Sequence, residues 1–121
     1  MDNRRDVGQK CEEIAARHLR RNGYRVIARN VRLRIGEIDI VARQGRVLVF
    51  VEVKAKTQEE YGAPREMVTA AKQRKLSQLA HLYMSQNRIT ETPVRFDVVE
   101  VVLDADGKPT VTLIPSAFDA R

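Results

Sequence analysis

The chain has 121 residues, 43% hydrophobic and 31% charged, a balance that indicates one folded domain over residues 1–121 rather than a disordered segment. A lone cysteine, Cys11, excludes an internal disulfide framework and a cysteine-built zinc site. The apolar runs are too short to cross a bilayer and the first residues lack the apolar part of a secretory signal, so we expect a cytoplasmic protein with no membrane partner.

Basic side chains outnumber acidic ones by 22 to 16, which gives a formal net charge of +6. The excess lies in residues 1–56, which carry 14 basic and 7 acidic side chains, and 11 of those 14 are arginines. Arginine is the side chain that best forks onto phosphate. A basic half of this kind favours a polyanionic partner, with nucleic acid as the default, and a merely well-solvated cationic surface is the equal alternative on charge alone.

The first predicted element is a helix that Asp6 caps and that runs to about Asn22, where Gly23 ends it. On a helical wheel its apolar residues form one stripe, and Glu12 lies at the edge of that stripe. We therefore expect Glu12 to point along the boundary of the core.

Five strands and a second helix are predicted in the rest of the chain. The strands cover residues 25–31, 35–42, 46–54, 94–103 and 110–114. Thr69 caps the helix, which runs to about Gln86, after a polar loop over 57–65. The order α-β-β-β-α-β-β predicts an α/β fold with a mixed central sheet flanked by helices, a core over about 6–115 and a short C-terminal tail.

The second and third strands form a hairpin that brings carboxylates beside a core. If Gln44-Gly45 is a two-residue loop, Glu37 lies directly across from Glu52, and Asp39 lies diagonal to it. Strand alternation then places Ile38 with Ile40 and Ala42 on one apolar face, opposite the charged groups. A one-residue bulge would instead turn Asp39 to the apolar face.

Clustered carboxylates beside an apolar strand repel one another and resist desolvation, and a bound divalent cation removes that penalty. Carboxylate oxygens with waters and phosphate completing an octahedron describe a Mg²⁺ site. Lys54 projects from the same face as Glu52, where its ammonium could orient the attacking water and stabilise charge on a phosphoryl group. The alternative is a solvated ladder of charges on an amphipathic strand.

The segments Gly-Glu-Ile-Asp-Ile-Val-Ala (36–42) and Val-Phe-Val-Glu-Val-Lys (49–54) resemble the PD-(D/E)xK nuclease superfamily. The closer resemblance is to the YraN-like bacterial proteins, which are similar to archaeal Holliday-junction resolvases, and it covers about residues 8–103. Further matching segments are Cys11-Glu12, Ala28-Arg29-Asn30, Val68-Thr69-x-x-Lys72-Gln73 and Arg95-Phe96-Asp97-Val98. The chain departs from the family pattern at Cys11, where glycine is usual, and at Ala55-Lys56.

This resemblance implies a restriction-endonuclease-like fold and a Mg²⁺- or Mn²⁺-dependent endonuclease that acts on DNA, including branched DNA such as Holliday junctions. Asp39 and Glu52 would be the metal ligands and Lys54 a catalytic residue. Glu12 would be an accessory catalytic carboxylate near the metal. Because the resolvases act as dimers, the resemblance also implies a homodimer.

Further side chains are candidates for contacts with nucleic acid. They are Arg29, Arg32, Arg34, Lys56, Lys72, Gln73, Arg74 and Lys75. Two alternatives to a nuclease stay open: a non-catalytic nucleic-acid-binding protein that retains the nuclease fold, and a protein-interaction adaptor whose basic face meets an acidic partner. Asp97 is expected to form a buried ion pair with Arg95 or another arginine rather than to serve the metal.

Overall fold

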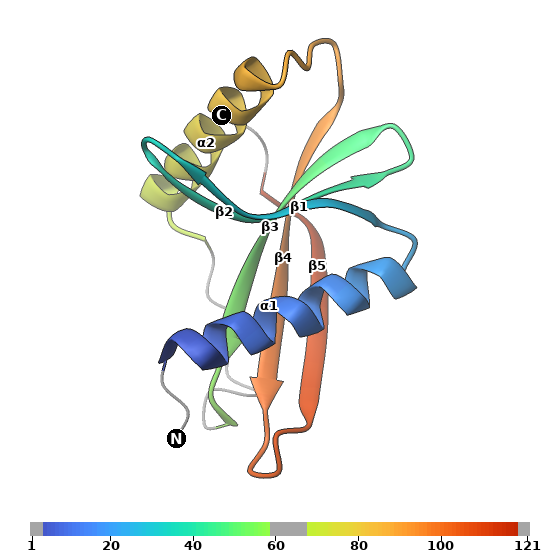
Figure 1. The fold of residues 1–121 in the computed structure, drawn as a ribbon, viewed down its shortest axis with the longest axis vertical. Coiled ribbons are helices and arrows are strands. Elements are labelled where there is room, and N and C mark those ends of the chain that lie inside the picture. The colour runs from blue at the N-terminus through green and yellow to red at the C-terminus, as the bar shows by residue number, and fades with distance from the viewer. Residues whose placement is uncertain (1–3, 59–67, 119–121) are drawn as a thin grey trace.

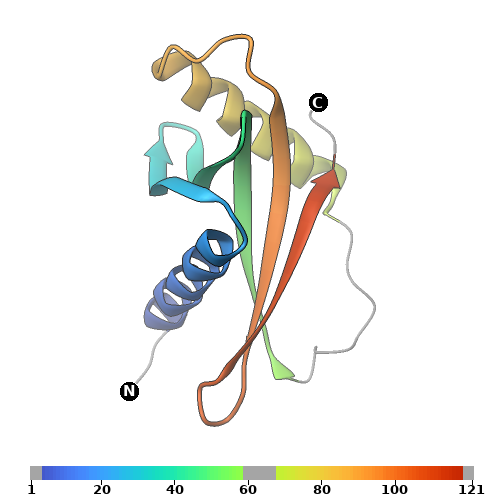
Figure 2. The same cartoon turned by 90° about the vertical axis from the view of Figure 1, so that its right-hand side faces the viewer.

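Two helices cover opposite faces of a five-stranded sheet in the computed structural model, which describes residues 4–58 and 68–118 (Figures 1 and 2). The elements are α1 (Arg4–Arg21), β1 (Arg25–Leu33), β2 (Gly36–Gln44), β3 (Val47–Lys56), α2 (Ala70–Gln86), β4 (Val94–Leu103) and β5 (Pro109–Phe118). The predicted order α-β-β-β-α-β-β and the mixed α/β architecture are confirmed.

The strands lie in chain order across the sheet, β1-β2-β3-β4-β5. Neighbours are antiparallel except β3 and β4, which run parallel because α2 carries the chain back between them. The parallel pair lies at the centre of the sheet, with β2 and β5 on its two sides. Neither helix of the described chain has both the length and the apolar character that a membrane crossing requires.

Alternate residues of the central strands pack into two separate cores. Beneath α1 the core residues are Cys11, Ala15, Ala16, Leu19, Tyr24, Ile40, Ala42, Val49, Val51, Val99 and Val101. Beneath α2 they are Ile38, Val41, Leu48, Phe50, Leu79, Ala80, Tyr83 and Phe96. The middle of β3 is thus buried on both faces, which explains why its sequence reads as a continuous apolar run.

Several element boundaries differ from the sequence prediction, including those of β2 and β3, which run to Gln44 and Lys56. The first helix begins at Arg4, so Asp6 is not its cap but lies in the first turn, where a carboxylate stabilises the helix dipole. The first and last strands are longer than expected, since β1 reaches Leu33 and β5 runs from Pro109 to Phe118. Thr69 is confirmed as the cap of α2, because its Oγ1 accepts from the Lys72 N–H at 3.1 Å. Most of the predicted loop over 57–65 lies outside the described residues.

The hairpin between β2 and β3 has a different register from the predicted one. Gln44 pairs with Val47, so the two-residue loop is Gly45-Arg46 rather than Gln44-Gly45. Gly45 has a φ of 59°, and glycine with positive φ suits the first position of a two-residue hairpin loop. The expected pairing of Glu37 with Glu52 is therefore wrong: the ladder ends at Ile40–Val51, and the next residues outward are Asp39 and Glu52.

Asp97 on β4 is the centre of a buried network that joins the α1–β1 connection to β5 at the edge of the sheet. Arg95 Nε and Nη2 lie 2.8 and 2.9 Å from its two carboxylate oxygens, which confirms the predicted ion pair. The Tyr24 hydroxyl donates to the same carboxylate at 2.7 Å, and the Ser116 N–H of β5 donates at 3.0 Å. Because every oxygen of Asp97 has a donor, this charge is buried without an unpaired group.

Candidate active site

Asp39 lies where β2 changes face. Ile40 packs beneath α1, whereas Ile38 packs beneath α2, so the strand does not keep the regular alternation that the sequence predicts. At this point the Asp39 carboxylate turns to the neighbouring strand, and its Oδ2 accepts the Val53 N–H at 2.8 Å. The Asp39 carboxylate thus takes the place of a backbone acceptor just beyond the last β2–β3 pair. This hydrogen bond holds Asp39 against the backbone between Glu52 and Lys54.

Three cavities meet around this point. The α2-side cavity, about 450 Å³, is lined by Glu52 and Lys54 of β3 together with residues of α2, β4 and β5. The α1-side cavity, about 350 Å³, is lined by Glu12, Glu37 and Asp39 and by residues of β1 and β3. A smaller junction cavity, about 170 Å³, is lined by both Asp39 and Glu52. The structure therefore brings Asp39 and Glu52 together at the junction cavity, with Lys54 on the α2 side and Glu12 on the α1 side.

Burial raises the pKa of Asp39 to about 6, against the opposing effect of the hydrogen bond from Val53. The negative charges of Glu52, Glu12 and Glu37 raise the pKa of this carboxyl further. Three acidic side chains, one each from α1, β2 and β3, are thus close enough to act electrostatically on Asp39. A cation at Asp39 would relieve both its desolvation and this repulsion.

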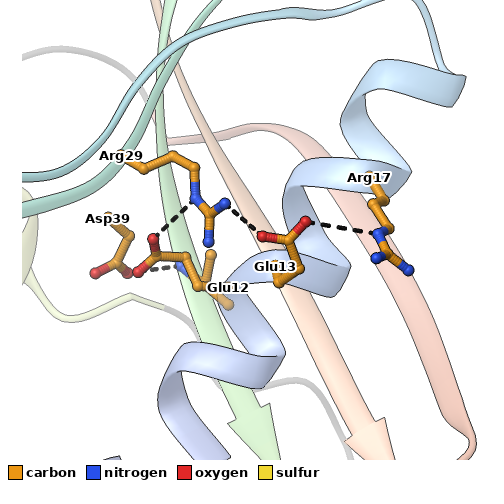
Figure 3. A network of polar contacts seen from close by, with 6 residues as sticks. Glu12, Glu13, Arg17, Arg29 and Asp39 are labelled. Atoms are coloured by element: carbon orange, nitrogen blue, oxygen red, sulfur yellow. Dashed lines mark hydrogen bonds and ion pairs between the residues drawn. The ribbon is translucent and has the colours of Figure 1, made fainter. Parts of the chain in front are cut away.

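The neighbouring glutamates are paired with basic side chains. Lys72 of α2 lies 2.7 Å from Glu52, measured from Nζ to Oε1. On the other side Arg29 of β1 forks onto α1, with Nε 3.1 Å from Glu12 Oε1 and Nη1 2.5 Å from Glu13 Oε2. Figure 3 shows Glu12 between Arg29 and Asp39, with Glu13 extending the network along α1. These basic residues reduce the net negative charge of the cluster. None of these ion pairs includes Asp39.

The donor set fits a hard divalent cation held by two carboxylates. Within residues 4–58 and 68–118, no three His, Cys, Asp or Glu side chains converge closely enough to hold an ion among them. Mg²⁺ is commonly held by only one or two carboxylates, with waters and substrate phosphates filling the other positions. Asp39 and Glu52 are oxygen donors on one cavity of about 170 Å³, room for several waters at about 30 Å³ each.

The basic candidates on α2 divide between the cavities and the outer surface. Lys72 and Lys75 line the junction cavity, whereas Arg74 is exposed. Gln73 is buried on the α2-side cavity, where its Nε2 donates to the Val68 carbonyl at 2.7 Å. Gln73 therefore lines the same cavity as Glu52 and also orders the chain at the start of α2.

The basic candidates on the strands have different surroundings. Arg32 is exposed and lines the α1-side cavity, and Arg34 is exposed in the turn between β1 and β2. Arg29 faces the two glutamates of α1. Lys56 is nearly buried, with its Nζ 3.3 Å from Glu100 Oε2 on β4, so this ammonium belongs to an internal ion pair.

Sequence reasoning missed the pairing of Glu52 with Lys72 and of Glu12 with Arg29. Lys72 and Arg29 stood out only as parts of family-like segments and as candidates for nucleic-acid contact, because each pair joins residues 17 or more positions apart in sequence. Glu100 was also missed. Its position beside Lys54 and Lys56 follows from the parallel register of β3 and β4, which no local pattern reveals.

Comparison with known proteins identifies the family. The sequence model of the family UPF0102, described as an uncharacterised protein family, matches residues 11–101 of this chain. A UPF0102 protein of Symbiobacterium thermophilum is 53% identical over 96% of this chain and 98% of its own length. One from Lachnoclostridium phytofermentans is 47% identical, covering 98% of this chain and 97% of the relative. Pyrococcus furiosus SfsA, solved in complex with Ca²⁺, aligns with a TM-score of 0.41 at 15% identity, over 89% of this chain and 62% of SfsA.

The two UPF0102 relatives match this chain almost from end to end, so the likeness covers the whole described fold rather than one motif. The resemblance to YraN-like proteins is confirmed, because UPF0102 is the YraN family. This chain therefore belongs to the UPF0102 family, which is classed with the PD-(D/E)xK nuclease superfamily.

Proposed function

We propose that this protein is a metal-dependent endonuclease that hydrolyses phosphodiester bonds in DNA. One observation carries the proposal: the half-buried Asp39 carboxylate accepts a hydrogen bond from the backbone between Glu52 and Lys54 and shares a cavity with Glu52. The two carboxylates can hold a divalent ion, and the amine of Lys54 can stabilise negative charge on a phosphate, so these groups from two neighbouring strands suit phosphodiester hydrolysis.

Asp39 and Glu52 would hold Mg²⁺ or Mn²⁺, which when bound supplies charge neutralisation at the phosphate and lowers the pKa of a bound water. Lys54 extends from the strand position after Val53 and lines the α2-side cavity beside Glu52. Its ammonium would face the phosphate and stabilise negative charge that grows in the transition state. Glu12, held by Arg29 on the α1 side, would orient water near Asp39.

The charge of the molecule supports DNA as the polyanion. Arg32 and Arg34 are exposed along the β1–β2 end of the sheet, and Arg74 and Lys75 are exposed on α2. Arg32 lines the α1-side cavity and Lys75 the junction cavity, so basic side chains from two elements flank the candidate site and could contact both strands of a branched or bent substrate. A homodimer would present two such sites to one junction, and sedimentation velocity tests that part of the proposal.

The direct test is cleavage of plasmid and four-way-junction DNA with Mg²⁺ or Mn²⁺ as the varied component. Wild-type protein is expected to cleave, and Asp39→Ala to lose at least about a hundredfold in rate, as the loss of a metal ligand would cause. Asp106→Ala removes an exposed carboxylate from the β4–β5 turn and is the matched control. Cleavage that Asp39→Ala leaves unchanged would remove this mechanism.

A non-catalytic nucleic-acid-binding protein is the second candidate. The pairing of Glu52 with Lys72 and of Glu12 with Arg29 favours it, because a metal would have to compete with these cations. In that case DNA affinity falls steeply with salt, as phosphate contacts release counterions, and no divalent metal supports cleavage.

A further inference from the structure

The α2-side cavity extends well beyond the candidate hydrolytic residues. Its volume of about 450 Å³ lies within the range of small-molecule sites, about 300–1,000 Å³. Glu52 and Lys54 line one part of it, so whatever enters the rest lies next to the proposed reaction centre. Neither a metal ion nor a single phosphate is large enough to need this space.

One wall of the α2-side cavity is apolar. Val98 of β4 and Ile114 and Ala117 of β5 form it, and Val98 is only 5% exposed. An occupant that covers these side chains gains about 25 cal/mol for each Å² of apolar surface removed from water. The wall therefore suits a group with an apolar face.

The other lining residues of the same cavity are mostly polar and carry both signs of charge, with Lys54 and Lys72 beside Glu52 and Glu100. Lys72 and Gln73 come from the first turns of α2, and Lys54 comes from β3. The N-terminal end of this 17-residue helix adds the positive end of its dipole. An anionic group thus belongs at the two lysines and the start of α2, and an apolar body belongs against Val98, Ile114 and Ala117.

We propose that the α2-side cavity receives the nucleoside attached to the scissile phosphate, an inference that rests on the proposed function. A nucleotide combines the two properties in the required order: its phosphate lies at Lys54 and Lys72, and its base covers Val98, Ile114 and Ala117. The base of a paired nucleotide is stacked inside the duplex and cannot reach such a wall. The substrate class is therefore DNA with an unpaired or weakly stacked nucleotide at the point of cleavage.

The test uses one duplex sequence with and without a single bulged nucleotide, with 2-aminopurine as the bulged base. Wild-type protein is expected to cleave the bulged duplex about tenfold faster than the paired one, and to raise the 2-aminopurine fluorescence on binding in Ca²⁺ as the base leaves the stack. Ala117→Phe fills the apolar wall, and Ala105→Phe places the same side chain in the exposed β4–β5 turn as the matched control.

Ala117→Phe is expected to abolish the preference for the bulged duplex and the fluorescence change, while Ala105→Phe keeps both. Ile114→Ala, which adds no bulk, should reduce both effects and so guards against misfolding of the phenylalanine variant. Equal cleavage of the two duplexes by wild type, or an Ala117→Phe protein indistinguishable from Ala105→Phe, overturns the inference and leaves the nuclease proposal standing. In another outcome no protein cleaves DNA, but wild type and Ala105→Phe show the fluorescence change and Ala117→Phe and Ile114→Ala lose it. That result supports binding of a base in the α2-side cavity and overturns the hydrolytic function.

Discussion

The Asp39 carboxylate on β2 accepts a hydrogen bond from the backbone N–H of Val53 on β3, with Oδ2 2.8 Å from the nitrogen. This bond lies just beyond the last backbone pair of the hairpin. The bond fixes Asp39, whose pKa is raised to about 6, beside the Glu52–Lys54 segment.

Asp39→Asn should stabilise the metal-free fold. The pKa of Asp39 is raised to about 6 from the ordinary 3.8, so its ionised form is disfavoured in the folded state. Wild-type stability is thus expected to fall as pH rises from 4 to 6, and to stay lower above that range. In EDTA at pH 7.5 urea unfolding should show a gain of order 2 kcal/mol for Asp39→Asn, and no gain at pH 4. Asparagine keeps an oxygen for the Val53 N–H, and a loss of stability at pH 7.5 would contradict the expected cost of the charge.

Lys72→Gln should strengthen metal binding. The Lys72 ammonium lies 2.7 Å from Glu52, the same carboxylate that would hold the metal. Because Lys72 is half-exposed, this pair is worth at most about 1 kcal/mol, so the Mn²⁺ affinity measured by calorimetry should rise about two- to fivefold. Arg74→Gln removes an exposed positive charge two residues further along α2 and should change the Mn²⁺ affinity less. Weaker Mn²⁺ binding in Lys72→Gln would indicate that Lys72 does not compete for Glu52.

Arg29→Gln separates positioning of Glu12 from contact with DNA. Arg29 holds Glu12 through Nε at 3.1 Å, so its loss should lower kcat about tenfold or more with little change in KM, and Arg29→Lys should restore only part of the rate. The exposed Arg32, changed to Gln, is the control for a phosphate contact and should raise KM instead. A rise in KM alone for Arg29→Gln would assign Arg29 to the DNA surface.

Tyr24→Phe tests the network around Asp97. Burial, with the carboxylate of Asp97 next in effect, raises the pKa of Tyr24 to about 12. The stabilisation by the neutral hydroxyl is present below pH 10 and is lost as pH rises from 10 to 12. At pH 7 the phenylalanine variant should unfold about 1 kcal/mol more easily, and the difference between the two proteins should narrow above pH 10. A constant difference up to pH 12 would contradict the role of the hydroxyl.

Local pattern was sufficient for the architecture. Alternation assigned Val49 and Val51 to one face of β3 and Leu48 and Phe50 to the other, and the structure buries these pairs beneath α1 and α2 respectively. The assignment of residues to faces is correct although the predicted hairpin loop is wrong. The true register moves each cross-strand partner by two residues, and a shift of two keeps each side chain on the same face.

The details of the site could not be predicted in the same way. The change of face between Ile38 and Ile40 depends on tertiary packing against two helices, which a period-two pattern cannot represent. Glu52 and Lys72 meet only because α2 crosses the sheet at this place, and the cavity against β5 depends on the pairing of β4 with β5. The acidic and basic residue types were visible in the sequence, but their partners were set by the fold.

The most direct test of the central claim is anomalous diffraction from crystals of the wild-type protein soaked in Mn²⁺. The account predicts one strong Mn²⁺ peak in the junction cavity, within coordination distance of carboxylate oxygens of both Asp39 and Glu52, and no peak in Asp39→Ala crystals. A fully soaked crystal without manganese between these two side chains, or with the ion bound elsewhere, would contradict it.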